Sequence, residues 1–173
     1  NRRLVISAKH RMGGKLYVAD RNCRVVEESD AALRERLAHP GKVRTDIAAH
    51  KQKLQEAAPL EREAAAAFAE IEKGRYRDEA QLKGLLRDRV IARYEDYRRL
   101  LASAALQTAE AREVQNKALQ AADLQLRGYR GMLQSVTDRD AALSKQARAD
   151  MASAAKQFEA HDAALRALVE ESQ

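Results

Sequence analysis

The turn that decides the predicted fold lies at residues 72–81, which read EKGRYRDEAQ. Gly74 suits the position just after a helix, because a left-handed backbone costs glycine little. Asp78, with Gln81 three residues later, is the capping signature of a new helix. A short connection of this kind joins antiparallel neighbours. The stretch therefore predicts the apex of an antiparallel helical hairpin, with its turn at residues 74–78.

An apolar stripe follows the apex at steps of three or four residues. It runs through 24 positions from Leu86 to Leu168, of which 19 are apolar. This spacing matches one face of a nearly straight helix. It predicts one helix over 79–172, about 140 Å long, with a kink where Gly128 and Gly131 weaken it.

The first helical arm, predicted over residues 26–73, is less regular because Pro40 and Pro59 interrupt it. Two architectures are compatible with these interruptions. One is an elongated two-helix coiled-coil hairpin with a kinked first arm. The other is an elongated three-helix bundle in which residues 38–45 reverse the chain. The hairpin is favoured because its two arms nearly match in length.

The composition predicts an all-α fold with a thin core. The 173 residues include 35 Ala, two Phe and no Trp, so each helix offers mostly small side chains for burial. An all-β fold is excluded by this richness in strong helix formers. A single elongated helical domain over 1–173 would bury little area in isolation, which favours a homo-oligomer.

The net charge of +6 is concentrated at one end of the chain. Residues 1–25 form a basic N-terminal arm with seven basic residues and one acid, whereas residues 26–173 hold 25 charges of each sign. An acidic protein surface is the favoured partner of this arm. Nucleic acid is disfavoured because Tyr17 is the arm's only aromatic residue and no reader fold is recognisable. No apolar run is long enough for a membrane span.

The sequence offers no pattern typical of an active site. It contains no phosphate-binding glycine loop, and its four histidines lack metal-ligand spacing. His50 and His161 fall on the apolar stripes and are interpreted as solvated or seam residues. We therefore expect no enzyme activity, no cofactor, no metal and no small-molecule substrate. The lone Cys23 suits a reducing cytosol, while a signal peptide removed before Asn1 stays open.

These features resemble the YscO/FliJ type of coiled-coil stalk protein of bacterial type III secretion, most closely the Hrp-cluster version of plant pathogens. The residues that carry the resemblance are the basic start (Arg2, Arg3, Lys9, Arg11), the midpoint 73–78 and the long arm 79–172. The resemblance implies a cytoplasmic, non-enzymatic component that is peripheral to the secretion apparatus at the inner membrane. Such a stalk links the hexameric secretion ATPase to the export gate protein and can handle secretion chaperones.

The resemblance also implies two partner-binding ends. The paired termini would present Arg2, Arg3, Lys9 and Arg11 to the ATPase ring, and the apex would present Arg75, Tyr76 and Arg77 toward the gate. Two other functions stay open at this point. They are a holdase-type helical chaperone and a nucleic-acid-binding coiled coil.

Overall fold

The computed structural model of the chain describes residues 16–19, 25–28 and 30–172. Its elements are β1 (Leu16–Ala19), β2 (Val25–Glu28), α1 (Asp30–Glu72), α2 (Glu79–Gly84), the π-helix η1 (Leu85–Ile91), α3 (Ala92–Ala102), α4 (Ala109–Asp138) and α5 (Ala141–Glu171). The described chain is thus predominantly helical, as its composition predicts. Where the sequence suggests one domain, the chain divides into two compact units, residues 1–42 and 43–173.

The first unit contains a two-stranded ladder that the sequence analysis missed. Strands β1 and β2 pair antiparallel, with Val18 opposite Val26 and Leu16 opposite Glu28. The prediction of helix from residue 26 is therefore wrong, because the helix begins at Asp30. Short runs of β-branched and aromatic residues favour this extended pairing, and the signal is brief beside the long helical stripes.

Helix α1 runs without a break from Asp30 to Glu72. The predicted interruptions at Pro40 and Pro59, and the alternative reversal at residues 38–45, are wrong. Both prolines are exposed, so water can hydrogen-bond to the carbonyl groups that they leave without an amide partner. The buried face of α1 can therefore continue past them.

Elements α2, η1 and α3 form one continuous helical segment that returns from the apex. In its middle the backbone widens to a π-helix, where the amide of Ala92 donates to the carbonyl of Arg87. A π turn adds a residue and rotates the following face. Tyr94 consequently points inward, while Arg93 is exposed and pairs with Glu63 at 3.3 Å.

The predicted helix over 79–172 is wrong, because the chain reverses twice within it. The first reversal is the connection at residues 103–108, between α3 and α4. The second follows α4, where Arg139 adopts a left-handed backbone (φ 56°) and Asp140 caps α5 by accepting from the amides of Ala142 and Leu143. Folding back buries the apolar stripe against the chain itself, which a straight rod of this length cannot do.

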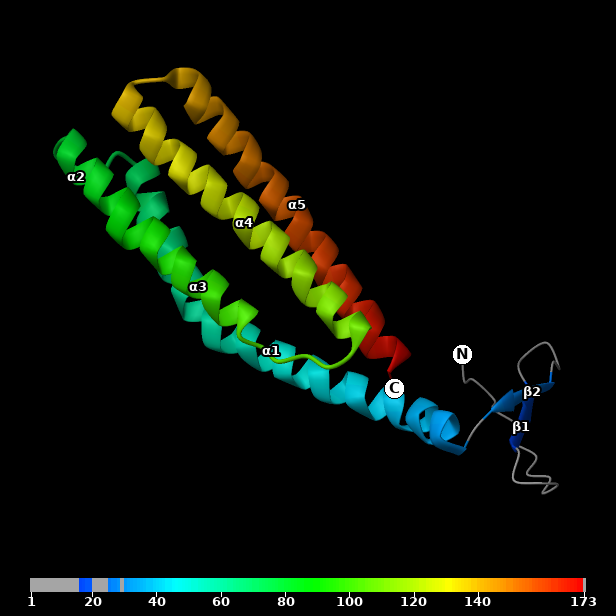
Figure 1. The fold of residues 1–173 in the computed structure, drawn as a ribbon. Helices are drawn as coiled ribbons and strands as arrows, with labels where there is room; N and C mark the ends of the chain where they lie inside the picture. The colour runs from blue at the N-terminus through cyan, green and yellow to red at the C-terminus, as the bar shows by residue number, and fades with distance from the viewer. Residues whose placement is uncertain (1–15, 20–24, 29, 173) are drawn as a thin grey trace. The chain divides into compact units, whose positions relative to one another are not determined.

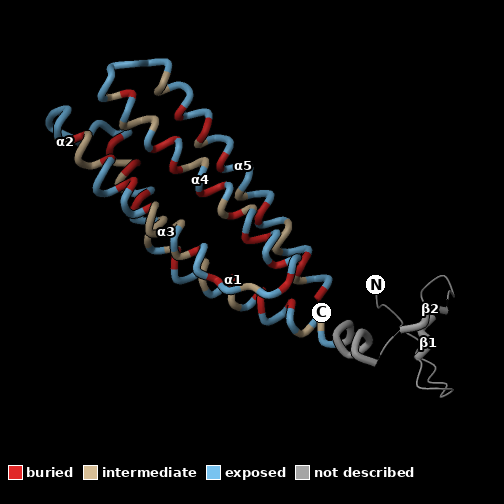
Figure 2. Tube along the Cα trace, in the orientation of Figure 1, coloured by how far each residue is buried: buried red, intermediate tan, exposed pale blue. Residues whose placement is uncertain are grey.

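The unit 43–173 is therefore an up-down-up-down four-helix bundle (Figure 1). Successive helical segments run in opposite directions, and their buried residues face the inside of the bundle (Figure 2). The stripe is covered within one chain, which removes the reason for expecting an oligomer. The oligomeric state itself stays a prediction.

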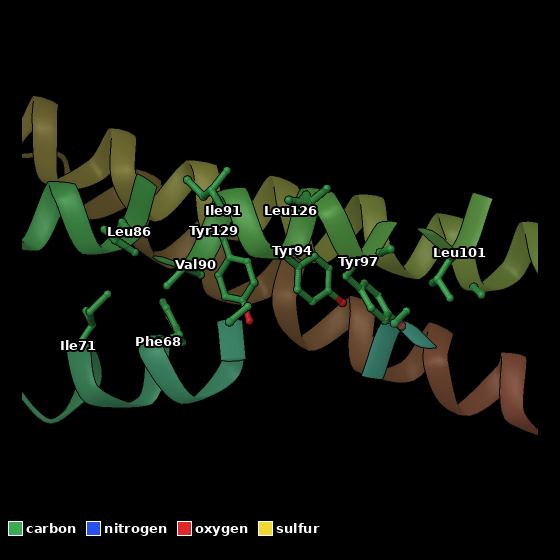
Figure 3. Packing of buried hydrophobic residues seen from close by; sticks show 14 of the residues in the cluster. Phe68, Ile71, Leu86, Val90, Ile91, Tyr94, Tyr97, Leu101, Leu126 and Tyr129 are labelled. Carbon is green, nitrogen blue, oxygen red and sulfur yellow. The ribbon is translucent and has the colours of Figure 1, made fainter. Parts of the chain in front are cut away.

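The larger group of buried side chains, here the main core, fills the bundle from the apex to its middle. Its buried members are Ala57, Ala64, Phe68, Ile71, Leu82, Leu86, Val90, Ile91, Tyr94, Tyr97, Leu101, Ala118, Ala122, Leu126 and Tyr129. Figure 3 shows its aromatic centre, where the ring centroid of Tyr129 lies 5.0 Å from that of Phe68 and 5.4 Å from that of Tyr94. Aromatic pairs at these distances add to the stabilisation from area burial.

Helices α4 and α5 approach each other closely because small residues line their interface. A Cβ added at Gly128 would lie 2.4 Å from Met151 Cγ and 2.9 Å from the carbonyl oxygen of Ala147. Gly128 therefore does not kink α4, as the sequence suggests, but permits α5 to pack against it.

A second, smaller group of buried side chains, here the end cluster, closes the bundle at the end opposite the apex. It consists of Val43, Ile47, Ala111, Val114 and Leu168. These residues come from α1, α4 and α5 alone, because the returning segment ends at Ala102. At this end the connection 103–108 takes the place of a fourth helix.

Candidate interaction site at the apex and a buried polar layer

The apex turn has the geometry that the sequence predicts. Gly74 follows α1 with a left-handed backbone (φ 71°), and its amide donates to the carbonyl of Ile71 at 2.9 Å. Asp78 Oδ1 then accepts from the amide of Gln81 at 2.7 Å, while Gln81 Oε1 accepts from the amide of Arg77 at 2.6 Å. Gly74 thus ends α1 and the reciprocal cap begins α2, so each end of the turn is fixed locally.

The glutamates around the apex are engaged by neighbouring cations. Glu70 pairs with Lys73 and Arg75, Glu72 with Arg148, and Glu79 with Lys83 and Arg139. The hydrogen bond from Arg75 holds the pKa of Glu70 below its usual value, and the one from Lys83 does the same for Glu79. Two of these pairs join different parts of the fold, since Arg148 lies on α5 and Arg139 lies in the turn that precedes it.

Two side chains of the apex remain available for a partner. Tyr76 is 39% exposed, which makes it an exposed large hydrophobic residue in the described part of the chain. The Arg77 guanidinium beside it has no ion-pair partner among the described residues. Of the predicted apex residues, Tyr76 and Arg77 thus project outward, whereas Arg75 is paired with Glu70. The other predicted residues (Arg2, Arg3, Lys9 and Arg11) lie outside the described residues.

A buried histidine pair lies between the main core and the end cluster. The Nε2 atoms of His50 on α1 and His161 on α5 are 3.0 Å apart, and both side chains are almost fully buried, at 1% and 2% exposure. The sequence interpretation left these histidines as solvated or seam residues and did not predict their contact, because nothing local relates two histidines 111 positions apart.

The hydrogen bonds around the pair fix which ring nitrogens carry protons. Asp162 Oδ1 lies 3.0 Å from His161 Nδ1, so this nitrogen donates to the carboxylate and His161 Nε2 is left as an acceptor. His50 Nε2 must then donate across the pair. The remaining nitrogen, His50 Nδ1, is consequently unprotonated, and it is buried with no hydrogen-bond partner among the described residues.

A second buried polar group, the Asp46 carboxylate, stabilises the connection at residues 103–108. Asp46 Oδ2 accepts from the amide of Gln107 at 2.9 Å, and from the amide and the hydroxyl of Thr108, both at 2.7 Å. Burial alone would raise the pKa of Asp46, but these hydrogen bonds outweigh it and hold the pKa below its usual value. A carboxylate on α1 thus holds the last two residues of the connection, directly before α4 begins at Ala109.

An open cleft of about 500 Å³ lies between α3 and α4, and another of about 490 Å³ lies between α4 and α5. In the first cleft Arg98 binds Asp123 through two hydrogen bonds (2.7 and 3.1 Å), and Arg130 binds Glu95 at 2.7 Å. Among the described residues, no three His, Cys, Asp or Glu side chains are grouped to hold a metal ion. None of the described helices combines the length and apolar character needed to cross a membrane.

Comparison of this chain with family models, with curated proteins and with solved structures finds no match.

Proposed function

We propose that this chain is a non-enzymatic helical adaptor that binds a protein partner through the apex of its bundle. The observation that carries the proposal is the exposed Tyr76 beside Arg77, on a turn that is capped at both ends. Tyrosine and arginine are the residue types that contribute most to protein interfaces. A turn that is ordered before binding also loses less conformational entropy when the partner docks.

We further propose, from the resemblance given above, that the partner belongs to a type III secretion apparatus. The candidates are the secretion ATPase, the export gate protein and secretion chaperones. The proposal is an adaptor and no longer a rigid two-helix stalk, since the chain folds back into a four-helix bundle. The basic arm at residues 1–25 is a second contact surface within this proposal, because it carries the charge excess of the chain.

A pull-down with the full chain tests the apex directly. The double variant Tyr76→Ala/Arg77→Ala should weaken capture of the secretion ATPase or gate protein by about tenfold or more, as expected for interface residues worth over 1 kcal/mol. Arg166→Ala is the matched control, because Arg166 is exposed on α5 and lies near the opposite end of the bundle. Equal capture by the parent chain and the apex variant, at equal helix content, would refute the apex as the binding site.

A separate experiment tests the basic arm. Replacing Arg2, Arg3, Lys9 and Arg11 by alanine should weaken the same complex at low salt, and the loss should shrink as salt is added. Retardation of nucleic acid in a low-salt gel shift would favour the competing nucleic-acid function instead.

A further inference from the structure

The histidine pair divides the interior of the bundle into two parts of unequal size. Along α1, His50 follows Ile47 of the end cluster and precedes Ala57 of the main core. Along α5, His161 precedes Leu168 of the end cluster and follows Phe158, which packs on the main core. The pair is thus the polar contact between α1 and α5 at the boundary of the two apolar groups.

We propose that the His50–His161 pair is a proton-operated latch, which holds α1 to α5 while neutral and opens the end-cluster part of the bundle when it takes up a proton. The proposal rests on how the pair is satisfied. Its single N–H···N bond uses one proton, and the Nδ1–H of His161 is already committed to Asp162. A further proton has only two nitrogens to go to.

Neither position accepts a proton while the end is closed. At His50 Nδ1, the new N–H group would be buried with no acceptor among the described residues. At His161 Nε2, it would face the N–H group of His50 at 3.0 Å and abolish the bond between the rings. Both outcomes place a charge in a nearly dry interior, which is costly unless water enters.

The ionisable groups around the pair do not compensate for this charge. On α5, Asp162 supports a proton on His161 but is itself largely in solvent, with 63% of its side chain exposed. On α3, Tyr97 stays neutral because burial raises its pKa. On α1, the Asp46 carboxylate is hydrogen-bonded to Thr108, and the charged residues Glu113 and Lys117 of α4 pair with each other.

Burial accordingly dominates the titration of both rings. It lowers the pKa of His50 to about 4, with repulsion from His161 as the second cause. It also lowers the pKa of His161, where the Asp162 carboxylate opposes the effect in part. The closed bundle is therefore most stable with both histidines neutral, whereas the open form of the bundle binds the additional proton.

The end-cluster part of the bundle is the part that can open alone. It holds five buried apolar residues from three helices, while the main core holds fifteen and includes the returning segment. Beyond the histidines, α1 and α5 are joined by the end cluster and by the Arg44 guanidinium, which donates to the carbonyl of Ser172 at 3.0 Å. Regions with few buried contacts open at lower free energy than the rest of a fold.

Hydrogen exchange of the full chain, followed by mass spectrometry and corrected for the intrinsic rate at each pH, tests the latch. Uptake of one proton on opening raises the opening equilibrium constant by about tenfold per pH unit between the closed and open pKa values. Amides of residues 44–52 and 163–171 should therefore exchange about tenfold faster at pH 5 than at pH 6. Amides of residues 118–129 in the main core should accelerate much less.

Two variants separate the latch from a general acid effect. His50→Gln/His161→Gln keeps an amide hydrogen bond across the pair but cannot titrate, so the pH response of the two end segments should disappear. His39→Gln removes a histidine from the same helix outside the pair and should leave the response intact. Equal acceleration in all segments of the parent chain, or an unchanged response in the double variant, would overturn the proposal.

If the double variant does not fold, an NMR titration of the parent chain tests the latch instead. The latch requires the ring protons of His50 and His161 to titrate below the ordinary histidine value of about 6.5, together with exchange at the two end segments. Ordinary midpoints for both rings, with no pH-dependent exchange there, would contradict it.

Discussion

Replacing Gly128 by alanine should destabilise the bundle, although alanine is the better helix former. In an exposed helix the change would stabilise by about 1 kcal/mol. At Gly128, however, the new Cβ would lie 2.4 Å from Met151 Cγ and 2.9 Å from the carbonyl oxygen of Ala147. The methionine side chain can move aside, but the carbonyl belongs to the backbone of α5, so the two helices must separate.

The size of the effect follows from these two opposing contributions. Overpacking of this kind costs about 1–3 kcal/mol, and the backbone contact places Gly128→Ala in the upper half of that range. After subtraction of the gain in helix propensity, we expect a net loss of about 1–2 kcal/mol in the free energy of unfolding. The corresponding drop in Tm is about 3 °C per kcal/mol for a chain of this size.

Urea unfolding followed by far-ultraviolet circular dichroism measures this loss, with Gly84→Ala as the matched control. The nearest atom to a Cβ added at Gly84 is Asp88 Oδ2 at 4.0 Å, so the same substitution should stabilise there by about 1 kcal/mol. The two variants are thus expected to shift the midpoint in opposite directions. A stabilised Gly128→Ala protein would show that α4 and α5 do not pack this closely.

Three further changes test other parts of the fold by the same unfolding assay. The pKa values of His50 and His161 are lower in the folded chain than the ordinary 6.5, so the stabilisation should be complete above about pH 6.5 and should be lost as the pH drops toward 4. The shift of the His50 pKa to about 4 alone corresponds to about 3 kcal/mol of unfolding free energy. An unfolding free energy that does not change over this pH range would contradict the prediction. Asp46→Ala should lower the free energy of unfolding by about 2–3 kcal/mol, because it leaves the amides and the hydroxyl at residues 107–108 without their acceptor. A loss below about 0.5 kcal/mol would mean that water replaces the carboxylate. Pro59→Ala should stabilise by about 1–3 kcal/mol, since an exposed helix-interior position regains a backbone hydrogen bond, and an unchanged midpoint would show that α1 is broken there.

The sequence predicts the local features of this fold well. The turn at Gly74 and the cap at Asp78 are confirmed, because both signals act within a few residues. Buried positions such as Leu86 and Leu168 were also predicted, since helical periodicity is itself a local property. Local patterns do not predict where one helix ends and the chain reverses into the next.

Each reversal depends on a contact that periodicity does not contain. Thr108 lies at one more position of the apolar stripe, and the Asp46 carboxylate that binds its amide and hydroxyl lies 62 residues away. Asp140 likewise reads as a polar stripe residue, although it proves to be a helix cap. The same reasoning applies to the candidate sites. Exposure of the apex at Tyr76 is predictable from the turn, whereas the histidine contact requires the tertiary fold.

The close packing of α4 against α5 has a consequence for the order in which this bundle assembles. Their contacts span the tight turn at Arg139 and Asp140, so little chain entropy is lost in closing the loop between them. The Asp46–Thr108 and His50–His161 contacts instead join residues 62 and 111 positions apart, and proteins form such distant contacts more slowly. Pairing of α4 with α5 is therefore expected early, and the contacts of α1 with residue 108 and with α5 later. The end of the bundle that carries the histidines then closes last during folding, and it is where a protease would first find an unfolded segment.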